Sequence, residues 1–382
     1  MMNKILKGVL LSITILLVAA NLYILFSGKT YIYKALIYNY VDINDNDIFT
    51  QRKILKGEGV EWPFHQQYQK KAMPAYLKDT LEKYKSVAFI IIKNDSLFFE
   101  KYWDGYSDSS ISNSFSMAKS VVGILTGIAV DEGKIKSLDE PVADFIPEFK
   151  DGGKEKISIR HLLMMSSGLD WDESYASLFS PTTEAYYGTD LRKLVVNQQV
   201  AIPPGHEFIY QSGNTELLAL ILEKATGKNL SDYASEKLWK PLHAMHTAEW
   251  SLDKENGREK SYCCFYSNAR DFARFGSLYL HDGKMFGQQI VSADYVKEAI
   301  TPSPITDEGK PNNSYGYQWW IKNQDGHQIF YMRGILGQYV VVIPDQQIIF
   351  VRLGHIRPDK DVDGQLVDLS LYIRGAIEMT KD

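Results

Sequence analysis

The chain has 382 residues, of which 45% are hydrophobic and 23% are charged. This balance excludes an intrinsically disordered chain, and the length suffices for one large or two medium domains with a sizeable core. With 42 basic and 47 acidic side chains and no long basic run, the chain lacks the concentrated cationic face that duplex binding requires. We therefore expect no nucleic-acid partner.

An uncharged apolar segment runs from Gly8 to Phe26, after Lys4 and Lys7. At about 1.5 Å per residue, a helix of this length can cross a bilayer. We expect an uncleaved anchor, because the segment stays apolar beyond the small residues 18–20 that resemble a signal-cleavage site. A cleaved signal and a buried core helix are the alternatives, although the segment lacks a polar face. Anchor and signal both place the remaining chain outside the cytoplasm, at the cell membrane or exported.

Residues 27–80 follow as a connector, which we expect to wrap onto the next domain because apolar residues recur in it. From Val87 the pattern becomes that of two strands, Val87–Lys93 and Leu97–Tyr102, around a tight turn. After Ser116 it changes to a helix with an apolar face, which ends at Gly133.

The rest of the chain is predicted to be helical first and then mostly extended. Helices are expected between residues 141 and 242 and at 269–280, strands at 318–322, 328–332, 338–343 and 348–353, and a last helix at 363–379. Strands at both ends with helices between them predict an α+β fold, in which an antiparallel sheet flanked by helices carries a helical insertion. We place the sheet part at about 81–115 and 260–382 and the helical part at about 116–259.

Ser116 stands at the start of the first long helix, and Lys119 follows one turn later on the same face. A helix N-terminus suits a serine that takes part in acyl transfer, because a free amide there can stabilise an oxyanion. Lysine can act as the base when burial or a nearby cation lowers its pKa. The spacing alone is weak evidence, since Ser251 and Lys254 repeat it in what we interpret as a surface turn. An N-capping serine with a solvated lysine is the structural alternative.

Further blocks surround this pair in a consistent order. They are Asp131–Pro141, Ile159–Leu169, Pro203–Gly205 and Tyr210-Gln-Ser212-Gly-Asn214. In order and spacing, residues 85 to 380 resemble the serine β-lactamase-like and penicillin-binding superfamily, in its class C branch. Within it, the 6-aminohexanoate-dimer hydrolase group looks most similar, on Cys263-Cys264, Ala269–Gly276, Tyr315–Trp320 and Gly334–Gln338.

The resemblance implies a β-lactamase-like fold and a set of catalytic roles. Ser116 would be the acylated nucleophile and Lys119 its base. Tyr210 would share a proton network with the lysine and protonate the leaving group, for which we expect the lysine ammonium to lower the phenol pKa. The backbone amides of Ser116 and Ile335 would bind the oxyanion. This chemistry needs no metal and no organic cofactor.

Substrate-binding residues are expected at the other two family blocks. Ser212 stands where class C enzymes carry an asparagine and offers a hydroxyl in place of an amide. Met332-Arg333-Gly334 stands where the family carries Lys-Thr-Gly, so the lysine that would bind a β-lactam or peptide carboxylate is missing. Arg333 would supply a cation only from the opposite face of the strand. Gly334 would let the substrate approach the backbone closely, with simple turn geometry as the alternative.

Two aromatic residues and the two cysteines complete the candidates. Trp171 and Tyr187 are expected to line an apolar substrate cleft, with core packing as an equal alternative. Cys263 and Cys264 are adjacent, so we expect a disulfide between them to be badly strained and interpret both as buried packing residues.

The predicted function is a membrane-anchored or exported serine hydrolase that cleaves an amide or ester through an acyl-enzyme on Ser116. Its expected partners are a small or peptide-like substrate and, through the N-terminal segment, the membrane. Met332 favours linear amides or carboxylic esters over β-lactams. A β-lactamase or a D-amino-acid-directed cell-wall peptidase or esterase stays open, and a non-catalytic protein that binds cell-wall fragments is the second alternative.

Overall fold

The computed structural model describes residues 2–358 and 366–381. Its centre is a six-stranded antiparallel sheet with strand order β11-β12-β13-β14-β2-β3. The strands are β2 (Ser86–Lys93), β3 (Ser96–Tyr102), β11 (Trp320–Gln324), β12 (His327–Gly334), β13 (Gln338–Ile343) and β14 (Ile348–Gly354). Because β14 pairs with β2, with Phe350 opposite Ile91, the two ends of the chain build one sheet as predicted.

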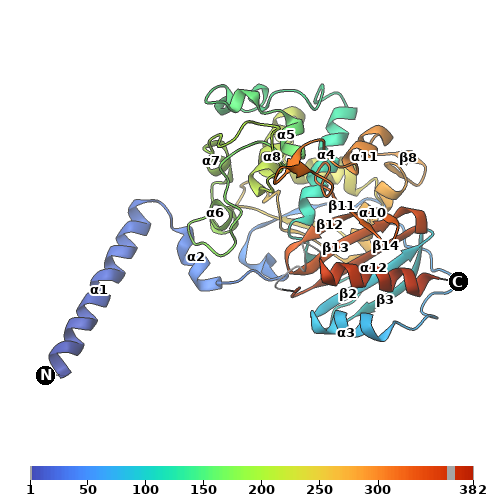
Figure 1. Cartoon of the computed structure of the whole chain (residues 1–382), viewed down its shortest axis with the longest axis horizontal. Helices are drawn as coiled ribbons and strands as arrows, with labels where there is room; N and C mark the ends of the chain where they lie inside the picture. Colours follow the sequence, from blue (N-terminus) through green and yellow to red (C-terminus); the bar gives the residue numbers. More distant parts are fainter. Residues whose placement is uncertain (1, 359–365, 382) are drawn as a thin grey trace.

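Helices cover both faces of this sheet (Figure 1). Helices α3 (Ala75–Lys83) and α12 (Val367–Thr380) pack on one face, and α4 (Met117–Asp131) and α10 (Ala269–Leu280) pack on the other. The sequence of β2 is apolar throughout because both faces of the strand are buried. Phe89 and Ile91 enter the core under α3 and α12, while Ile90 and Ile92 enter the core around α4. The first residues of the predicted helix 363–379 lie outside the described residues.

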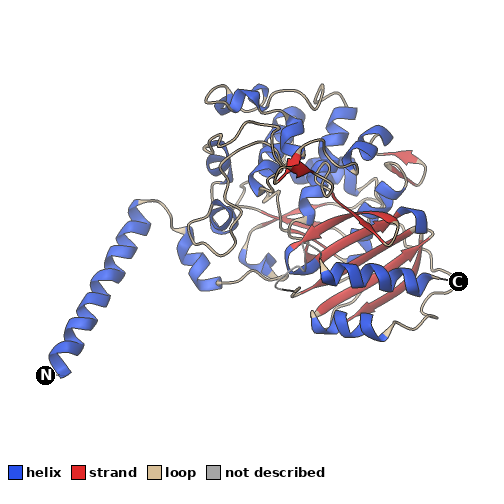
Figure 2. Cartoon of the chain, in the orientation of Figure 1, coloured by secondary structure: helices blue, strands red, loops and turns tan. Residues whose placement is uncertain are grey.

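The remaining helices lie between the two groups of strands in the sequence and form the part above the sheet in Figure 2. They are α5 (Ile159–Leu163), α6 (Pro181–Tyr187), α7 (Leu191–Val196), α8 (Ser212–Thr226), α9 (Leu230–Ala234) and, later in the chain, α11 (Ala293–Ala299). Helix α4 joins this part to the sheet, because it packs on α8 as well as on β12 and β13. The α+β class, with helices inserted into an antiparallel sheet protein, is confirmed.

A second, four-stranded sheet has the order β1-β5-β6-β4, and no sequence pattern indicated it. Its strands are β1 (Gln51–Ile54), β4 (Ser112–Asn113), β5 (Ala248–Ser251) and β6 (Phe265–Ser267), and two hairpins add β7 (Lys284–Met285) with β8 (Gln288–Gln289) and β9 (Thr306–Asp307) with β10 (Lys310–Pro311). Strands of two to four residues are too short to show an alternating pattern. Strand β1 and the first part of α3 come from residues 27–80, so this connector is built into the folded unit.

Helix α1 (Met2–Phe26) projects away from the rest of the molecule, and α2 (Tyr31–Tyr38) follows it against α6 (Figure 1). The segment Lys4–Phe26 is long and apolar enough to cross a membrane, and only 6% of its most apolar stretch is buried. A core helix would be covered by protein, so the interpretation of this segment as a buried helix is wrong.

The connector supplies a testable prediction about the folded unit. A chain that begins at residue 27 keeps β1 and α3 and is expected to unfold in one cooperative thermal transition. A chain that begins at residue 81 loses the partner of β5 and exposes the core side chains that Leu77 covers, so its melting temperature should fall by more than about 5 °C. Circular dichroism on both chains measures the difference, and equal melting temperatures would show that residues 27–80 add nothing to the fold.

Candidate active site

Ser116 sits in a tight turn between β4 and α4. The residue before it, Phe115, has a φ of +43°, a left-handed conformation that non-glycine side chains rarely adopt. Three hydrogen bonds hold the turn: the Ser114 amide donates to Phe265 O (2.8 Å), the Phe115 amide to Asn113 Oδ1 (2.8 Å), and the Met117 amide to Ser114 O (3.2 Å). The turn therefore presents Ser116, partly exposed, at the N-terminus of the buried helix α4.

Lys119 lies below Ser116 and is almost completely buried, with 1% of its surface exposed. Its Nζ lies 3.1 Å from Ser116 Oγ, 3.0 Å from Ser212 Oγ and 3.1 Å from Tyr262 O. Burial lowers the pKa of Lys119 to about 8, although the negative charge of Glu173 acts in the opposite direction. A substantial share of the lysine is therefore neutral near pH 8.

The side chain of Tyr210, in the turn before α8, approaches Ser116 and Lys119. Its hydroxyl is hydrogen-bonded to Ser116, and the Nζ of Lys119 lies 4.9 Å from the centre of its ring. The expectation that the phenol pKa is lowered is wrong: burial raises the pKa of Tyr210, and the carboxylate of Glu173 raises it further. The phenol thus stays protonated over the neutral pH range and can donate a proton.

Glu173 is the site residue that the sequence did not reveal. One carboxylate oxygen accepts from Ser212 Oγ (2.6 Å) and from Tyr175 Oη (2.8 Å). The other accepts from the Ser212 amide (2.7 Å) and from Trp171 Nε1 (2.8 Å), so the carboxylate caps the N-terminus of α8. It follows Trp171 in an irregular segment with no recognisable pattern, and only folding brings it to Ser212.

Gly334, at the end of β12, lies against the turn that carries Ser116. A Cβ at this position would lie 2.3 Å from Ser114 O and 3.2 Å from Phe115 Cβ. With a φ of −120°, the residue needs no left-handed freedom; it must be small because two backbones meet. Within the described residues, the amides of Ser116 and the following Ile335 donate no hydrogen bond to another protein group. Two free amide donors therefore lie on neighbouring segments.

The neighbours of Gly334 on β12 point in opposite directions. Met332 is fully buried in the core around α4, so this position holds no cation near Ser116. Arg333 shares the strand face of Tyr331, but its guanidinium lies over the ring of Trp320, 5.3 Å from the ring centre. Its charge is close enough to lower the pKa of Tyr210, against the larger effect of burial.

Two of the expected substrate-binding aromatics have other surroundings. Trp171 is buried against the start of α8, where a Cβ on Gly213 would lie 2.6 Å from its ring, so it supports Glu173 rather than lining an open cleft. Tyr187 stacks on Tyr38 of α2 and packs edge-on against Tyr186. That position does not support the predicted contact of Tyr187 with substrate.

Cys263 and Cys264 are buried as predicted, but they form a disulfide with each other, which the expected strain between adjacent cysteines had argued against. Cys264 has a φ of +64°, a left-handed backbone conformation that favours glycine. The pair directly follows Tyr262, whose carbonyl accepts from Lys119, and the carbonyl of Cys263 accepts from Trp250 Nε1 (2.8 Å). The disulfide thus lies in the segment that holds the lysine.

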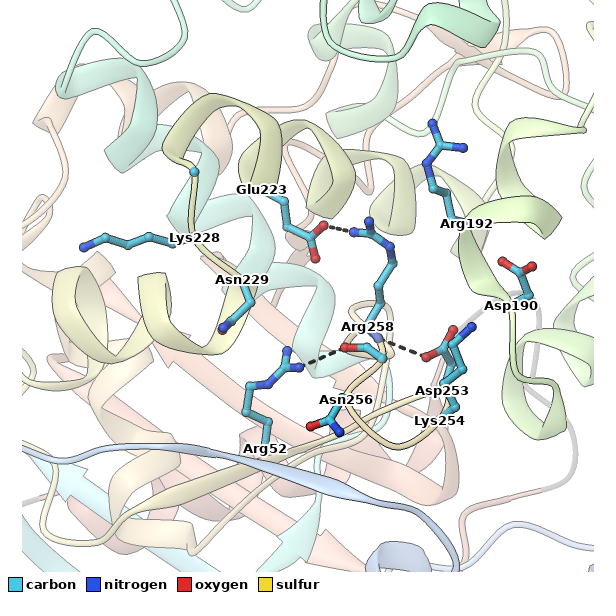
Figure 3. Close-up of a pocket in the computed structure, with 12 residues that line it drawn as sticks. Arg52, Asp190, Arg192, Glu223, Lys228, Asn229, Asp253, Lys254, Asn256 and Arg258 are labelled. Atoms are coloured by element: carbon cyan, nitrogen blue, oxygen red, sulfur yellow. Dashed lines mark hydrogen bonds and ion pairs between the residues drawn. The ribbon is translucent and has the colours of Figure 1, made fainter.

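The second Ser-x-x-Lys copy shows that spacing alone carries no chemistry. Ser251 ends β5 and exchanges hydrogen bonds with Gln51, while Lys254 is exposed in the following turn. A polar cavity of about 600 Å³ lies beside this turn and is lined by charged side chains (Figure 3). Arg258 pairs with Glu223, and none of the residues around Ser116 lines this cavity.

Comparisons with known proteins agree with the fold described above. The sequence profile of the Beta-lactamase family matches residues 74–370. The 6-aminohexanoate-dimer hydrolase of Paenarthrobacter ureafaciens is 28% identical over 319 residues, covering 77% of this chain and 80% of that protein. A Bacillus anthracis structure provisionally described as a 6-aminohexanoate-dimer hydrolase superposes with a TM-score of 0.76 at 22% identity, covering 88% and 92% of the two chains. A family VIII carboxylesterase has a TM-score of 0.64 at 15% identity, covering 84% and 99%.

The contact at Gly334 yields a prediction. Replacing it (Gly334→Ala) forces β12 away from the Ser116 turn, so we expect a loss of stability of about 1–3 kcal/mol, measured by urea unfolding. Hydrolytic activity should fall further than the unfolded fraction explains, because the two free amides move apart. Met332→Leu on the same strand conserves volume and serves as the control, with an expected cost below about 1.5 kcal/mol. An alanine variant as stable and as active as the control would refute the close approach.

Proposed function

The chain belongs to the beta-lactamase family, and we propose that it is a serine hydrolase that cleaves an amide or ester bond through an acyl-enzyme on Ser116. Proteins related to it in sequence or fold include an amide-cleaving hydrolase and a carboxylesterase. The observation that carries the proposal is the contact between Lys119 Nζ and Ser116 Oγ, 3.1 Å, inside a buried site. An N-capping serine with a solvated lysine would not make this contact.

The direction of the hydrogen bonds around Lys119 favours it as the base. A carboxylate only accepts, so the single hydroxyl proton of Ser212 goes to Glu173, and Ser212 Oγ must accept from the lysine. The carbonyl of Tyr262 also only accepts. A neutral amine has two protons, and these two acceptors use both. Its lone pair is then left for the hydroxyl proton of Ser116.

Acylation follows from this arrangement. Ser116 Oγ attacks the carbonyl carbon of the substrate as its proton moves to Lys119 Nζ, and the new oxyanion is held by the amides of Ser116 and Ile335. When the carbon–heteroatom bond breaks, the leaving nitrogen or oxygen takes a proton from the neutral phenol of Tyr210. The lysine ammonium returns a proton to the phenolate directly, because Ser116 Oγ is esterified and carries no proton.

Deacylation runs the same steps with water. A water molecule attacks the ester carbonyl of the acyl-enzyme and gives up one proton to the neutral lysine. The tetrahedral intermediate then collapses, and Ser116 Oγ recovers its proton as the carboxylic acid product leaves. Each group returns to its starting protonation state, so the cycle consumes only water and substrate.

The substrate class follows from the position of Met332. This residue lies in the apolar core, so the position of the family's lysine offers no cation to a β-lactam or peptide carboxylate. Linear amides and carboxylic esters are therefore favoured. A panel of a short p-nitrophenyl ester, a linear aminohexanoate oligomer, nitrocefin and a D-Ala-D-Ala peptide separates the classes, and rapid turnover of nitrocefin would contradict this assignment.

The site is proposed to work outside the cytoplasm. Helix α1 supports this location because it can serve as an anchor or as an export signal. The disulfide between Cys263 and Cys264 also supports it, since disulfides persist in oxidising compartments.

The nucleophile can be tested by covalent labelling. We expect a fluorophosphonate probe to add its mass to a peptide containing Ser116, and Ser116→Ala to lose both labelling and at least about 1,000-fold of kcat. Ser251→Ala is the matched control, because Ser251 begins the other Ser-x-x-Lys sequence and should leave labelling intact. Intact-protein and peptide mass spectrometry measure the labelling. Equal labelling of wild type and Ser116→Ala would contradict the proposal.

The role of the lysine predicts a pH dependence. Protonated Lys119 cannot accept a proton, so kcat/KM should rise by about tenfold per pH unit below the lysine pKa and level off above about 8. Glu173→Gln removes the charge that raises this pKa, so the midpoint should move to lower pH. The plateau should also fall, because a glutamine can donate to Ser212 and turn its hydroxyl proton toward the lysine.

The neighbouring Asp172 provides the control for this pH profile. It is exposed, and Asp172→Asn removes the same charge one residue away from the site, so its midpoint should match wild type. A Glu173→Gln profile with the wild-type midpoint would show that the carboxylate only supports the fold.

A further inference from the structure

Helix α2 is apolar around most of its circumference, yet protein covers only part of it. Its buried residues Tyr31, Ile32 and Ala35 face the rest of the molecule, where α2 packs on α6. Other apolar side chains of α2 and the turn after it are exposed, with exposed fractions of 58% for Leu36, 76% for Ile37, 43% for Tyr38 and 73% for Tyr40. We call these four residues the α2 patch. A helix that is apolar on nearly all sides is normally buried in protein or in lipid.

The α2 patch lies close to the end of the helix that can cross a membrane. Only residues 27–30 separate Phe26, at the end of α1, from Tyr31, at the start of α2, a distance of at most about 18 Å for an extended chain. Figure 1 shows the two helices joined by this short turn. Tyrosine is enriched where a membrane meets water, and Tyr23 in the last turns of α1 matches that position.

Cationic side chains lie in the same region. Lys29, Lys34 and Lys193, together with the carboxylates of Glu184 and Asp190, line a cavity of about 360 Å³ formed by the turn after α1 together with α2, α6 and α7. Lysines beside an apolar surface suit the boundary between acyl chains and phosphate headgroups. An apolar patch beside a membrane-length helix and these lysines favours one binding partner for the patch. That partner is the bilayer in which α1 lies.

Residues 171–180 connect this region to the active site. At one end, Tyr175 donates to Glu173 (2.8 Å), the carboxylate that also accepts from Ser212 Oγ (2.6 Å), so Tyr175 lies at the edge of the Ser116 site. At the other end, the exposed Phe179 contacts Tyr23 of α1 edge-on, 6.5 Å between ring centres, and Lys29 Nζ lies 6.0 Å from the same ring. The five residues from Tyr175 to Phe179 thus span from the edge of the Ser116 site to the end of α1.

We propose that the α2 patch rests on the bilayer that α1 crosses, and that residues 171–180 hold the mouth of the Ser116 site at the membrane surface. The substrate is then an amphiphilic ester or amide, whose apolar chain stays in the lipid while its carbonyl reaches Ser116. This inference rests on the proposed hydrolase function and on α1 as an anchor. The chemistry is the acyl transfer to Ser116 described above, with water as the only co-reactant.

The position of the patch can be measured on the full-length protein in phospholipid vesicles. Cys263 and Cys264 are paired, so a single added cysteine can be labelled with bimane. We expect lipids that carry a nitroxide near the headgroup to quench bimane at Ile37→Cys and Phe179→Cys at least about threefold more than at Phe286→Cys. Phe286 is also exposed, but it lies in the β7–β8 hairpin. Equal quenching at all three positions, or self-association through residue 37 without quenching, would overturn the proposal.

The substrate class is tested on the same vesicles with two esters of one leaving group, a water-soluble p-nitrophenyl butyrate and a long-chain p-nitrophenyl ester dissolved in the lipid. Ile37→Asp should lower hydrolysis of the lipid-dissolved ester by about tenfold and leave the soluble ester within about twofold. Phe286→Asp should change neither rate. Equal losses on both esters, or no loss on either, would overturn the membrane-facing mouth.

Ser116→Ala keeps the two proposals distinguishable. If this variant loses both activities while Ile37→Asp loses neither, the hydrolase function stands and the membrane inference fails. If Ser116→Ala hydrolyses both esters at the wild-type rate, the hydrolase function itself fails.

Discussion

The amine of Lys119 is removed from water, and a charged amine loses its hydration when it is buried. The fold offsets this loss with three oxygen partners at about 3 Å and with the carboxylate of Glu173 behind one of them. Two opposing effects set the outcome: burial favours the neutral amine, and Glu173 favours the charged one. Their balance puts the pKa of Lys119 at about 8, so the lysine can both accept and return a proton.

The partners of Lys119 come from segments far apart in the sequence. Ser116 belongs to the turn before α4, Ser212 to the start of α8, and Tyr262 to the segment before the disulfide. The opposite side of the site comes from β12, which reaches the Ser116 turn only because Gly334 has no side chain. The six-stranded sheet makes this possible, since strands from both ends of the chain pair in it. Each side of the site is therefore fixed by backbone packing rather than by a flexible loop.

The part of the site without regular structure is the segment that also reaches α1. Residues 171–180 supply Glu173 to the catalytic group and Phe179 to the end of the membrane-length helix. If the α2 patch rests on a bilayer as proposed, a change in that contact would reach Ser212 and Lys119 through a short piece of chain. This arrangement gives the apolar surface of α2 a physical role beside a polar catalytic group.

The sequence by itself determined the α+β class and the central strands, because continuous apolar strands are local signals. It predicted the pair Ser116 and Lys119 from helical spacing together with the order of the surrounding family blocks. It also predicted Tyr210 and Ser212 as neighbours of that pair, through the order of family blocks. Only the tertiary structure decided that Glu173 orients Ser212, that Tyr187 faces α2, and that Cys263 and Cys264 are bonded. It also reversed the expected pKa shift of Tyr210. These features depend on burial and on contacts between distant segments, which no local pattern encodes.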